Sequence, residues 1–254
     1  MKKILSTLAL SAAITTIVSA DLLRIEMGAG AWGQDPSGNI TYSDSTGASG
    51  EYKSNETSYT GAYAWMLIKH PLPIIPNVRL EYTKVKDEGI STGTFENFTA
   101  PIGSPSSLEM SEYDIIPYYN LLDNTFWMTI DLGLDIKVID STYTAEGVTI
   151  NNLGTIGTYT DSSTVAVPMV YGRFRVEIPG TNLGLESDIK YITYDGSTLY
   201  DARIKVDYTF DLDVIEPGIE IGYRTQKFDI TDDDDNTKMD MDFSGVYAGV
   251  MLRF

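Results

Sequence analysis

The chain has 254 residues, a formal net charge of −18 and no cysteine. The length fits one domain, the absence of cysteine excludes disulfides and thiolate chemistry, and the acidic balance argues against a nucleic-acid partner. Beyond the N-terminus no run of about 18 apolar residues occurs, so the sequence predicts no membrane-spanning helix. A transmembrane β-barrel is still compatible with this composition, because its lipid-facing residues alternate with polar ones.

The N-terminus has the pattern of a secretory signal peptide. Two lysines precede an apolar centre, and small residues up to Ala20 supply a cleavage site. Hydroxyl residues interrupt this short apolar centre, which argues against a membrane anchor. We therefore predict that residues 1–20 are removed on export and that residues 21–254 form one mature domain.

The mature chain alternates between apolar and polar residues in ten segments, which predicts ten β-strands. The predicted strands lie at residues 23–32, 58–68, 78–83, 112–120, 128–138, 166–177, 185–191, 200–210, 219–226 and 239–254. The clearest signal runs from Met128 to Val138, where six apolar residues alternate with polar residues and one glycine. The facing of 58–68 is open, because aromatic and small residues compete for its apolar face.

The connections between the predicted strands alternate in length. Long polar loops are predicted at residues 35–57, 87–110 and 140–163, and short turns at residues 69–77, 120–125 and 178–182. Long external loops, short periplasmic turns and an even strand number are the rule for outer-membrane barrels. The sequence therefore predicts an all-β fold, a transmembrane antiparallel up-and-down β-barrel of about ten strands, with eight or twelve as alternatives. A secreted β-sandwich would not account for the loop asymmetry.

The C-terminal stretch, residues 239–254, carries the strongest indication of a barrel. Counting back from Phe254, every second residue to Val246 is apolar or small, and the alternate set from Arg253 back to Phe243 is mixed and includes two glycines. A terminal strand needs protection for its edge, which a closed barrel provides when the last strand pairs with the first. The ending resembles the terminal signal of bacterial outer-membrane β-barrels, which implies that the barrel-assembly machinery recognises Phe254.

Three short motifs extend this resemblance to the whole mature chain. They are Gly28-Ala29-Gly30-Ala31-Trp32-Gly33, Pro36-Ser37-Gly38, and the turn from His70-Pro71-Leu72-Pro73 to Pro76-Asn77-Val78-Arg79. With them the chain resembles a family of small proteobacterial outer-membrane β-barrels whose name describes its fold and not an activity. The resemblance implies location in the cell outer membrane, and we expect outer-membrane lipid and lipopolysaccharide as partners.

Residues that could carry catalysis are scarce. His70 is the only histidine, and it lies in a proline-rich turn at the predicted periplasmic end. The ten-strand count is similar to that of the omptin proteases, whose site needs a histidine with aspartates at the external rim. No predicted external loop contains a histidine, and no Gly-x-Ser-x-Gly elbow is present. We therefore predict no enzymatic activity and no cofactor.

An acidic run near the C-terminus is a candidate metal site. Asp232, Asp233, Asp234 and Asp235 could bind Ca²⁺ or Mg²⁺ through oxygen ligands, although the run lacks the glycine and the final glutamate of an EF-hand loop. The alternative is a solvated charged segment. If cations bind, we expect them to bridge the protein to lipopolysaccharide phosphates.

Charged residues of both signs fall on the predicted inner face of the barrel. They are Arg24, Glu26, Arg79, Glu81, Asp131, Asp135, Lys137, Arg173, Arg175, Glu186, Lys190, Arg203, Lys205 and Arg224. Charges away from bulk water must be paired, so we predict a structural salt-bridge network. The alternative is the lining of an aqueous channel. The predicted function is accordingly a contribution to envelope structure or surface interaction, with a narrow cation-preferring, porin-like diffusion channel as the alternative.

Overall fold

The computed structural model describes residues 23–254 except 73, 152, 213–214 and 233–235, so the predicted signal peptide lies outside the described residues. The described residues form the strands β1 (Arg24–Ser43), β2 (Ser49–Ser54), β3 (Tyr59–Lys69), β4 (Asn77–Thr94), β5 (Phe98–Thr125), β6 (Met128–Ile150), β7 (Thr155–Glu177), β8 (Leu183–Tyr194), β9 (Ser197–Thr209), β10 (Glu216–Asp232) and β11 (Thr237–Arg253). No helix long and apolar enough to cross a membrane occurs among them.

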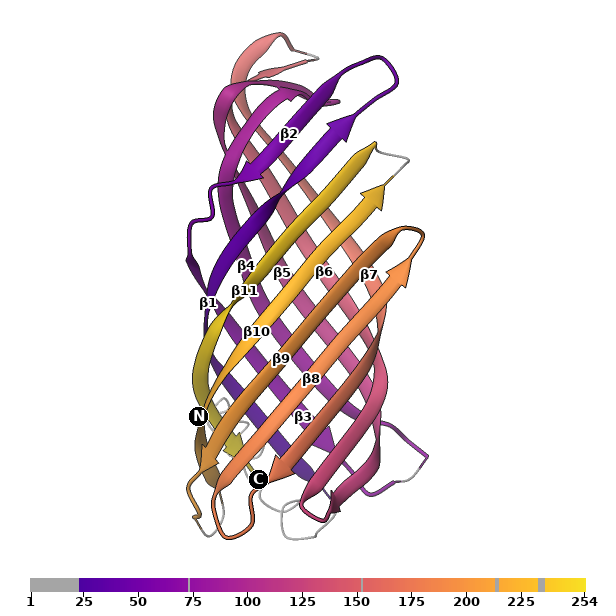
Figure 1. Ribbon diagram of the computed structural model, residues 1–254, viewed down its shortest axis with the longest axis vertical. Helices are drawn as coiled ribbons and strands as arrows, with labels where there is room; N and C mark the ends of the chain where they lie inside the picture. The colour runs from indigo at the N-terminus through magenta and orange to yellow at the C-terminus, as the bar shows by residue number, and fades with distance from the viewer. Residues whose placement is uncertain (1–22, 73, 152, 213–214, 233–235) are drawn as a thin grey trace, which may run out of the picture.

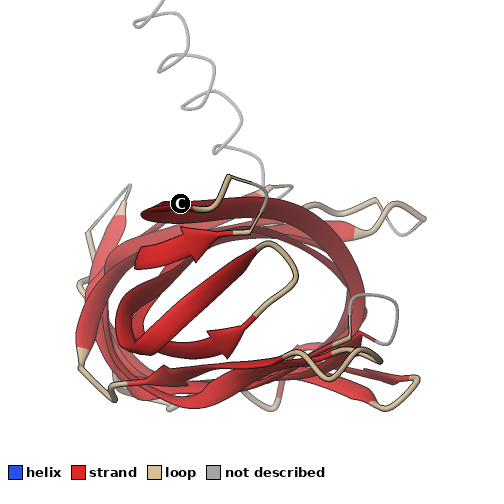
Figure 2. Ribbon diagram, turned by 90° about the horizontal axis from the view of Figure 1, so that it is seen from above, coloured by secondary structure: helices blue, strands red, loops and turns tan. Residues whose placement is uncertain are grey.

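The strands close into a ring of antiparallel neighbours (Figures 1 and 2). Strand β11 pairs with β1 over most of its length, with Leu252 opposite Met27 and Tyr247 opposite Trp32. The N–H of Phe254 donates to the carbonyl of Ile25 at 2.9 Å, so the last residue belongs to the same seam. The predicted pairing of last and first strands is confirmed.

Strands β2 and β3 share one position in the ring. Both lie between β1 and β4, and the segment 55–58 separates them. The eleven strands therefore occupy ten positions, which confirms the predicted ten-stranded antiparallel barrel.

The strands are much longer than a membrane requires. Strand β5 has 28 residues and β6 and β7 have 23 each, whereas about 9–11 residues suffice to cross a bilayer. The prediction of long loops at residues 35–57, 87–110 and 140–163 is wrong, because most of these residues continue the strands. The turn predicted at 120–125 lies instead at Phe126 and Trp127, which have φ of 52° and 62°.

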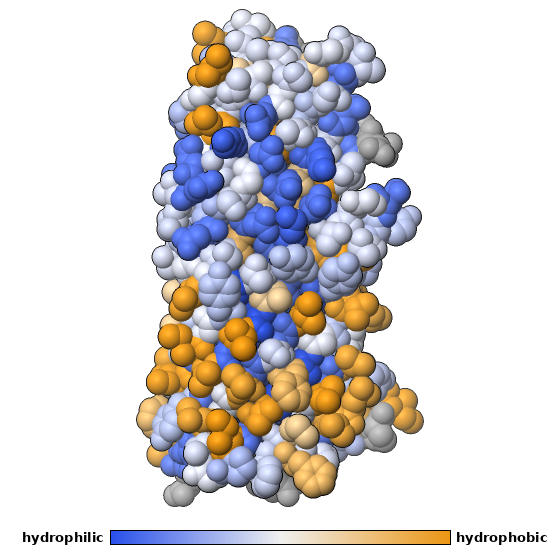
Figure 3. Space-filling view, in the orientation of Figure 1, coloured by the Kyte–Doolittle hydropathy of each residue, from blue (hydrophilic) through white to orange (hydrophobic). Residues whose placement is uncertain are grey.

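The outer surface divides the barrel into two halves (Figure 3). In the half that contains the chain termini, here the proximal half, the outward residues are apolar, as with Leu132, Leu134 and Ile136 of β6. We call the rest the distal half; it comprises the described residues of 35–58, 84–111, 139–167, 193–199 and 227–243. Its outward residues are mostly polar, so the apolar band of the proximal half is the part that matches a bilayer.

The burial of alternate side chains shows which face of each strand points inward. Leu134 is 61% exposed and Asp135 is fully buried, so the predicted facing of β6 is confirmed. In β3, whose facing was open, Tyr63, Trp65 and Leu67 point inward. Gly28 of β1 makes room for this choice, because a Cβ there would lie 2.5 Å from Nε1 of Trp65.

Candidate functional site

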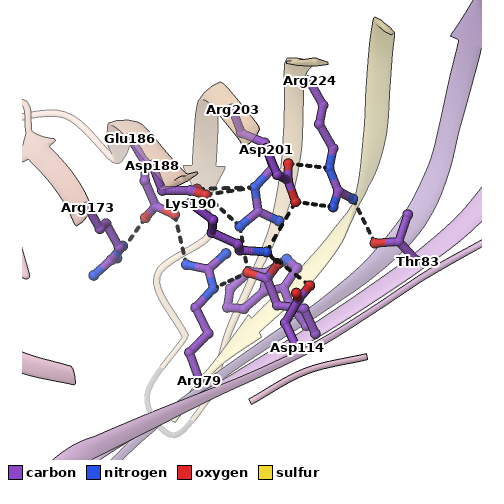
Figure 4. Close-up of polar contacts among 12 residues, drawn as sticks. Arg79, Thr83, Asp114, Arg173, Glu186, Asp188, Lys190, Asp201, Arg203 and Arg224 are labelled. Carbon is purple, nitrogen blue, oxygen red and sulfur yellow. Dashed lines mark hydrogen bonds and ion pairs between the residues drawn. The ribbon is translucent and has the colours of Figure 1, made fainter. Parts of the chain in front are cut away.

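The inner face of the proximal half carries a set of buried charged side chains, here the ionic network. Its members are Glu26, Arg79, Glu81, Glu112, Asp114, Asp131, Asp135, Lys137, Arg173, Arg175, Glu186, Asp188, Lys190, Asp201, Arg203, Lys205, Asp207, Glu220 and Arg224. Period-2 alternation places these residues inward on eight strands, β1 and β4 to β10, so their side chains meet across the lumen. Figure 4 shows the centre of this set.

Lys190 of β8 lies at the middle of the ionic network. Its Nζ donates to Glu81 Oε2 at 2.6 Å, to Asp114 Oδ2 at 3.0 Å and to Asp201 Oδ2 at 3.3 Å. These carboxylates come from three other strands, β4, β5 and β9. One ammonium group therefore connects opposite walls of the barrel.

Asp201 is held by a second cation. The guanidinium of Arg224 contacts it twice, from Nε to Oδ1 at 2.9 Å and from Nη2 to Oδ2 at 2.6 Å, and Nη1 of Arg224 donates to Thr83 Oγ1 at 2.7 Å. Such two-point contacts fix orientation as well as charge. Lys137 of β6 adds contacts of 2.9 Å to Glu112 and to Asp114.

Glu186 of β8 is a second point of convergence, nearer the chain termini. Arg173 donates to its Oε2 at 2.6 Å and Arg175 at 3.3 Å, while Arg79 reaches its Oε1 at 3.3 Å. Arg175 also makes a two-point contact with Asp207 at 2.6 and 2.9 Å. The network thus continues along the barrel axis and is not a single ion pair.

Aromatic side chains complete the interior beside the charges. Tyr63 Oη and Trp65 Nε1 both donate to Glu220 Oε1, at 2.7 and 2.9 Å. The ammonium of Lys205 lies 4.4 Å from the centroid of the Trp65 ring, and the guanidinium of Arg224 lies 4.9 Å from that of Trp32. Both are within cation–π range.

The ionic network is almost inaccessible to solvent, and its most exposed member, Arg203, retains 9%. Lys137, Lys190, Asp131 and Glu112 have no accessible surface, and Arg79 retains 2%. Side chains that line a water-filled lumen are accessible to solvent, and these side chains are not. The predicted salt-bridge network is therefore present.

The predicted inner-face set is largely correct but incomplete. Arg24 is the exception, since it is half-exposed at the proximal rim, where it contacts Glu26 at 2.7 Å. The prediction omitted Glu112, Asp114, Asp188, Asp201, Asp207 and Glu220. The alternation in the sequence places all six on the polar faces of predicted strands, so the period identifies them although the predicted set did not include them. Asp135 is buried, but neither of its carboxylate oxygens has a hydrogen-bond partner among the described residues.

A second feature lies in the distal half, a cavity of about 280 Å³ that we call the distal cavity. Six aromatic side chains line it: Tyr42, Tyr52, Phe95, Phe98, Tyr143 and Tyr159. The carboxylates of Glu96 and Asp161 also line it, and none of its described lining residues is basic. Tyrosine and phenylalanine rings with adjacent carboxylates make a surface suited to a small organic ligand.

The rings of the distal cavity pack in a continuous row. Phe98 stacks on Phe95 with centroids 4.5 Å apart and on Tyr159 at 4.6 Å, and Phe95 lies 6.2 Å from Tyr42. Burial raises the pKa of Tyr159, and the negative charge of Asp161 raises it further. Only the second of these effects depends on the sign of the charge: the carboxylate of Asp161 opposes a phenolate and favours a cation, whereas burial opposes any charge.

The wall of the distal cavity is held from the neighbouring hairpin. Nδ2 of Asn151 donates to the carbonyls of Phe95 and Glu96 at 3.1 and 3.0 Å, and its backbone N–H donates to the carbonyl of Asn97 at 3.1 Å. Gly50 lies under Phe95, where a Cβ would come within 2.6 Å of the ring. The turn that carries Glu96 is therefore fixed before any ligand arrives.

Sequence reasoning did not find the distal cavity. Its aromatic residues are separated by up to 117 positions, from Tyr42 to Tyr159, and they lie in the segments 35–57, 87–110 and 140–163, for which the sequence predicts loops. The signal was the alternation of single aromatic residues with Ser and Thr, as around Tyr143 and Tyr159. That alternation indicates strands with a polar outer face.

Of the residues predicted to bear chemistry, His70 and Asp232 are described, and they lie on different segments of the barrel. His70 lies in the β3–β4 turn, where its backbone N–H donates to Asn77 Oδ1 at 2.9 Å and its Nε2 is 3.1 Å from the carbonyl of Pro76. Asp232 ends β10 and is exposed, whereas Asp233, Asp234 and Asp235 lie outside the described residues. In the part of the chain that is described, no group of three or more His, Asp or Glu side chains is placed to hold a metal ion. The cation site at 232–235 stays a prediction.

Known proteins were compared with the chain. No family model matches the sequence, and no curated protein matches it. Among solved structures, the outer membrane protease OmpT from Escherichia coli matches with a TM-score of 0.52 and 12% identity, covering 93% of this chain and 97% of the protease. The transport unit of the autotransporter AIDA-I from Escherichia coli matches with a TM-score of 0.42 and 7% identity, covering 92% and 90%.

The match to OmpT, an outer-membrane protein, supports the barrel fold, and the location of this chain in the outer membrane stays a prediction. The finer resemblance to one proteobacterial family gains no support from these comparisons, and the expected partners lipopolysaccharide and assembly machinery stay predictions. The prediction that the protein is not an enzyme is contradicted. A barrel of the same architecture is a protease, so the lack of a familiar catalytic motif does not establish that this chain is inactive, and the fold leaves the matter undetermined.

Proposed function

We propose that this protein is a sealed outer-membrane barrel that acts at the cell surface through its distal half. The observation that carries the proposal is the solvent-inaccessible ionic network, which occupies the lumen at the level of the apolar band. A barrel closed in this way has its accessible features at its ends. The distal half supplies long strands, a polar outer face and a preformed cavity.

The alternative prediction, a narrow cation-preferring channel, requires a water path through the ionic network. Such a path would leave Lys137 or Lys190 accessible to solvent, and both are fully buried. Opening it would separate carboxylates from their cations in a confined lumen, and breaking a buried ion pair costs about 3–5 kcal/mol. The buried network therefore favours the sealed barrel.

Single-channel recording of the refolded protein in planar bilayers tests the seal. We expect no discrete conductance steps from protein whose band on gels shifts on boiling, as a folded barrel's should. Discrete steps with a reversal potential that favours cations would overturn the proposal and support the channel.

Surface labelling tests the orientation. Because the chain has no cysteine, one can be introduced at Ser45, in the distal β1–β2 turn, or at Thr181, in the proximal turn between β7 and β8; both positions are exposed. A membrane-impermeant maleimide added to intact cells should label Ser45→Cys and should spare Thr181→Cys until the cells are opened. The reverse pattern would contradict a distal half that faces outward.

A further inference from the structure

We infer that the distal cavity is a binding site for a small organic cation, with an ammonium group carried on an apolar body. The inference rests on the proposed function, because it assigns a ligand class to the half of the barrel proposed to act at the surface. Three features of the cavity carry it: its rings, its charge and its rigidity.

The rings supply the first part of the recognition. Six aromatic side chains line a space of about 280 Å³, near the lower limit of about 300 Å³ for ligand pockets, so the ligand must be small. A cation within about 6 Å of an aromatic centroid is attracted by the negative face of the ring, and several rings around one cation add their contributions. An apolar ligand would also fit against the rings, so the rings alone do not determine whether the ligand is charged.

The carboxylates determine the sign of the ligand's charge. Glu96 and Asp161 lie on the lining, both exposed at its rim, and the described lining residues include no lysine or arginine to neutralise them. An anionic ligand would be repelled, and a neutral one would gain nothing from these groups. The ionic network shows the contrast, because there the carboxylate of Asp201 already has a cation of the protein, the guanidinium of Arg224, as its partner. The described lining of the distal cavity supplies the carboxylates of such an ion pair and no cation to match them.

Rigidity supplies the third part. Asn151 holds the backbone of Phe95, Glu96 and Asn97 with three hydrogen bonds, and Thr99 Oγ1 donates to Asn151 Oδ1 at 3.2 Å. A site fixed in this way loses little conformational entropy when a ligand binds. The geometry is therefore that of a preformed site and not of a gap between mobile loops.

Calorimetric titration with choline and with its neutral isostere 3,3-dimethylbutan-1-ol tests the inference directly. The protein is used folded in a polyoxyethylene detergent, which carries neither an ammonium group nor a sugar that could compete. We expect choline to bind at least about tenfold more tightly than the isostere. Equal binding of the two, or binding of glucose without choline, would overturn the inference and in the second case would indicate a carbohydrate site.

Matched variants connect the binding to the cavity. Glu96→Gln combined with Asp161→Asn should weaken choline binding about tenfold, whereas Glu146→Gln, an exposed distal carboxylate outside the lining, should leave it unchanged. Tyr159→Leu should weaken binding and Tyr159→Phe should retain it, with protease resistance of the distal half verifying that each variant is folded around the cavity. Choline binding that survives the double substitution would overturn the assignment. A barrel that is silent in bilayers and ignores choline would refute this inference alone, whereas a conducting barrel would refute the proposed function.

Discussion

The two halves of the barrel are built from the same strands, but their apolar and polar residues face in opposite directions. In the proximal half the outer face is apolar and the interior is charged, as with Leu134 outside and Lys137 inside on β6. In the distal half the arrangement is reversed, with threonine and serine outside and Leu108, Met110 and Phe243 buried inside. A period of two residues is kept throughout, and only the assignment of faces changes.

The difference follows from the solvent on the outside. Lipid requires apolar residues on the outer face, so polar residues are confined to the lumen, where they must pair with one another. Water outside the distal half allows an ordinary apolar interior. The point of exchange along β4 lies between Tyr82, where the apolar band ends, and Lys84, the first charged outward residue. Substitutions of paired cations, outward residues and buried residues in the two halves test this comparison.

Removing a central cation of the ionic network should have the largest effect. Lys190→Met leaves the carboxylates of Glu81 and Asp114 buried without one of their donors, and we expect a loss of about 3–5 kcal/mol in the free energy of unfolding. Lys227→Met is the matched change in the distal half. Lys227 contacts Asp240 and Asp242 at 3.1 and 3.2 Å but is partly exposed, so we expect a loss below about 1 kcal/mol. Urea unfolding in lipid vesicles measures both, and equal losses would contradict the contrast.

Placing a cation on the outer face should have the next largest effect. Leu134→Arg puts a charge in the apolar band, where arginine costs about 2–4 kcal/mol near the bilayer midplane. Thr142→Arg places the same residue on the same face of β6, eight positions further along and in the distal half, and should change stability by less than about 0.5 kcal/mol. The yield of folded protein in vesicles, read from the gel shift, gives the comparison. A harmless Leu134→Arg would mean that the apolar band is not in the membrane.

Truncating a buried side chain in the distal interior should destabilise that half alone. Phe98 is 3% exposed and stacks on Phe95 and Tyr159, and truncation of a buried phenylalanine to alanine costs about 3–5 kcal/mol. We expect Phe98→Ala to make the distal half sensitive to protease while the proximal barrel keeps its gel shift. Ile156→Ala, at a distal position that is 79% exposed, is the control and should stay resistant. Loss of the gel shift with Phe98→Ala would show that the halves fold as one unit.

The sequence predicted the proximal half well because one physical rule governs it. Lipid outside and paired charges inside give a strict alternation, so β6, β9 and β11 and the facing of Leu134 and Asp135 could be read directly. The strand 58–68 was ambiguous because Trp65 and Tyr63 are apolar enough for lipid; the hydrogen bonds to Glu220 that draw them inward involve a residue about 155 positions away.

The distal half was missed because its composition resembles that of loops. Residues such as Ser104, Ser106, Thr142 and Ser162 are common in turns, and a local pattern cannot tell that neighbouring strands will pair with them. The distal cavity was beyond reach for a related reason, since Tyr42, Phe98 and Tyr159 meet only after the long strands are in register. The inner charged residues could be predicted as a set, but their pairing, such as Lys190 with Glu81, depends on tertiary packing.

The pH dependence of two distal carboxylates gives the smallest and most specific test. Asp87 is buried, which raises its pKa above the ordinary 3.8 despite hydrogen bonds from Tyr52 at 2.6 Å and Ser54 at 2.9 Å. The folded state therefore keeps this proton at a pH where the unfolded chain has lost it, so the stability of the distal half should fall as the pH rises from about 3.8 through the raised pKa. Asp87→Asn should remove that fall.

The contribution of Glu109 to stability has the opposite pH dependence, because the hydrogen bond from Lys84 lowers its pKa. This contribution is present above the unfolded pKa and is lost as the pH falls through the folded one. Protease resistance of the distal half, followed from about pH 3 to pH 7 in the native protein, Asp87→Asn and Glu109→Gln, separates the two. Differences of the same sign for both variants would contradict the assignment of Asp87 to an apolar interior and Glu109 to a wet surface.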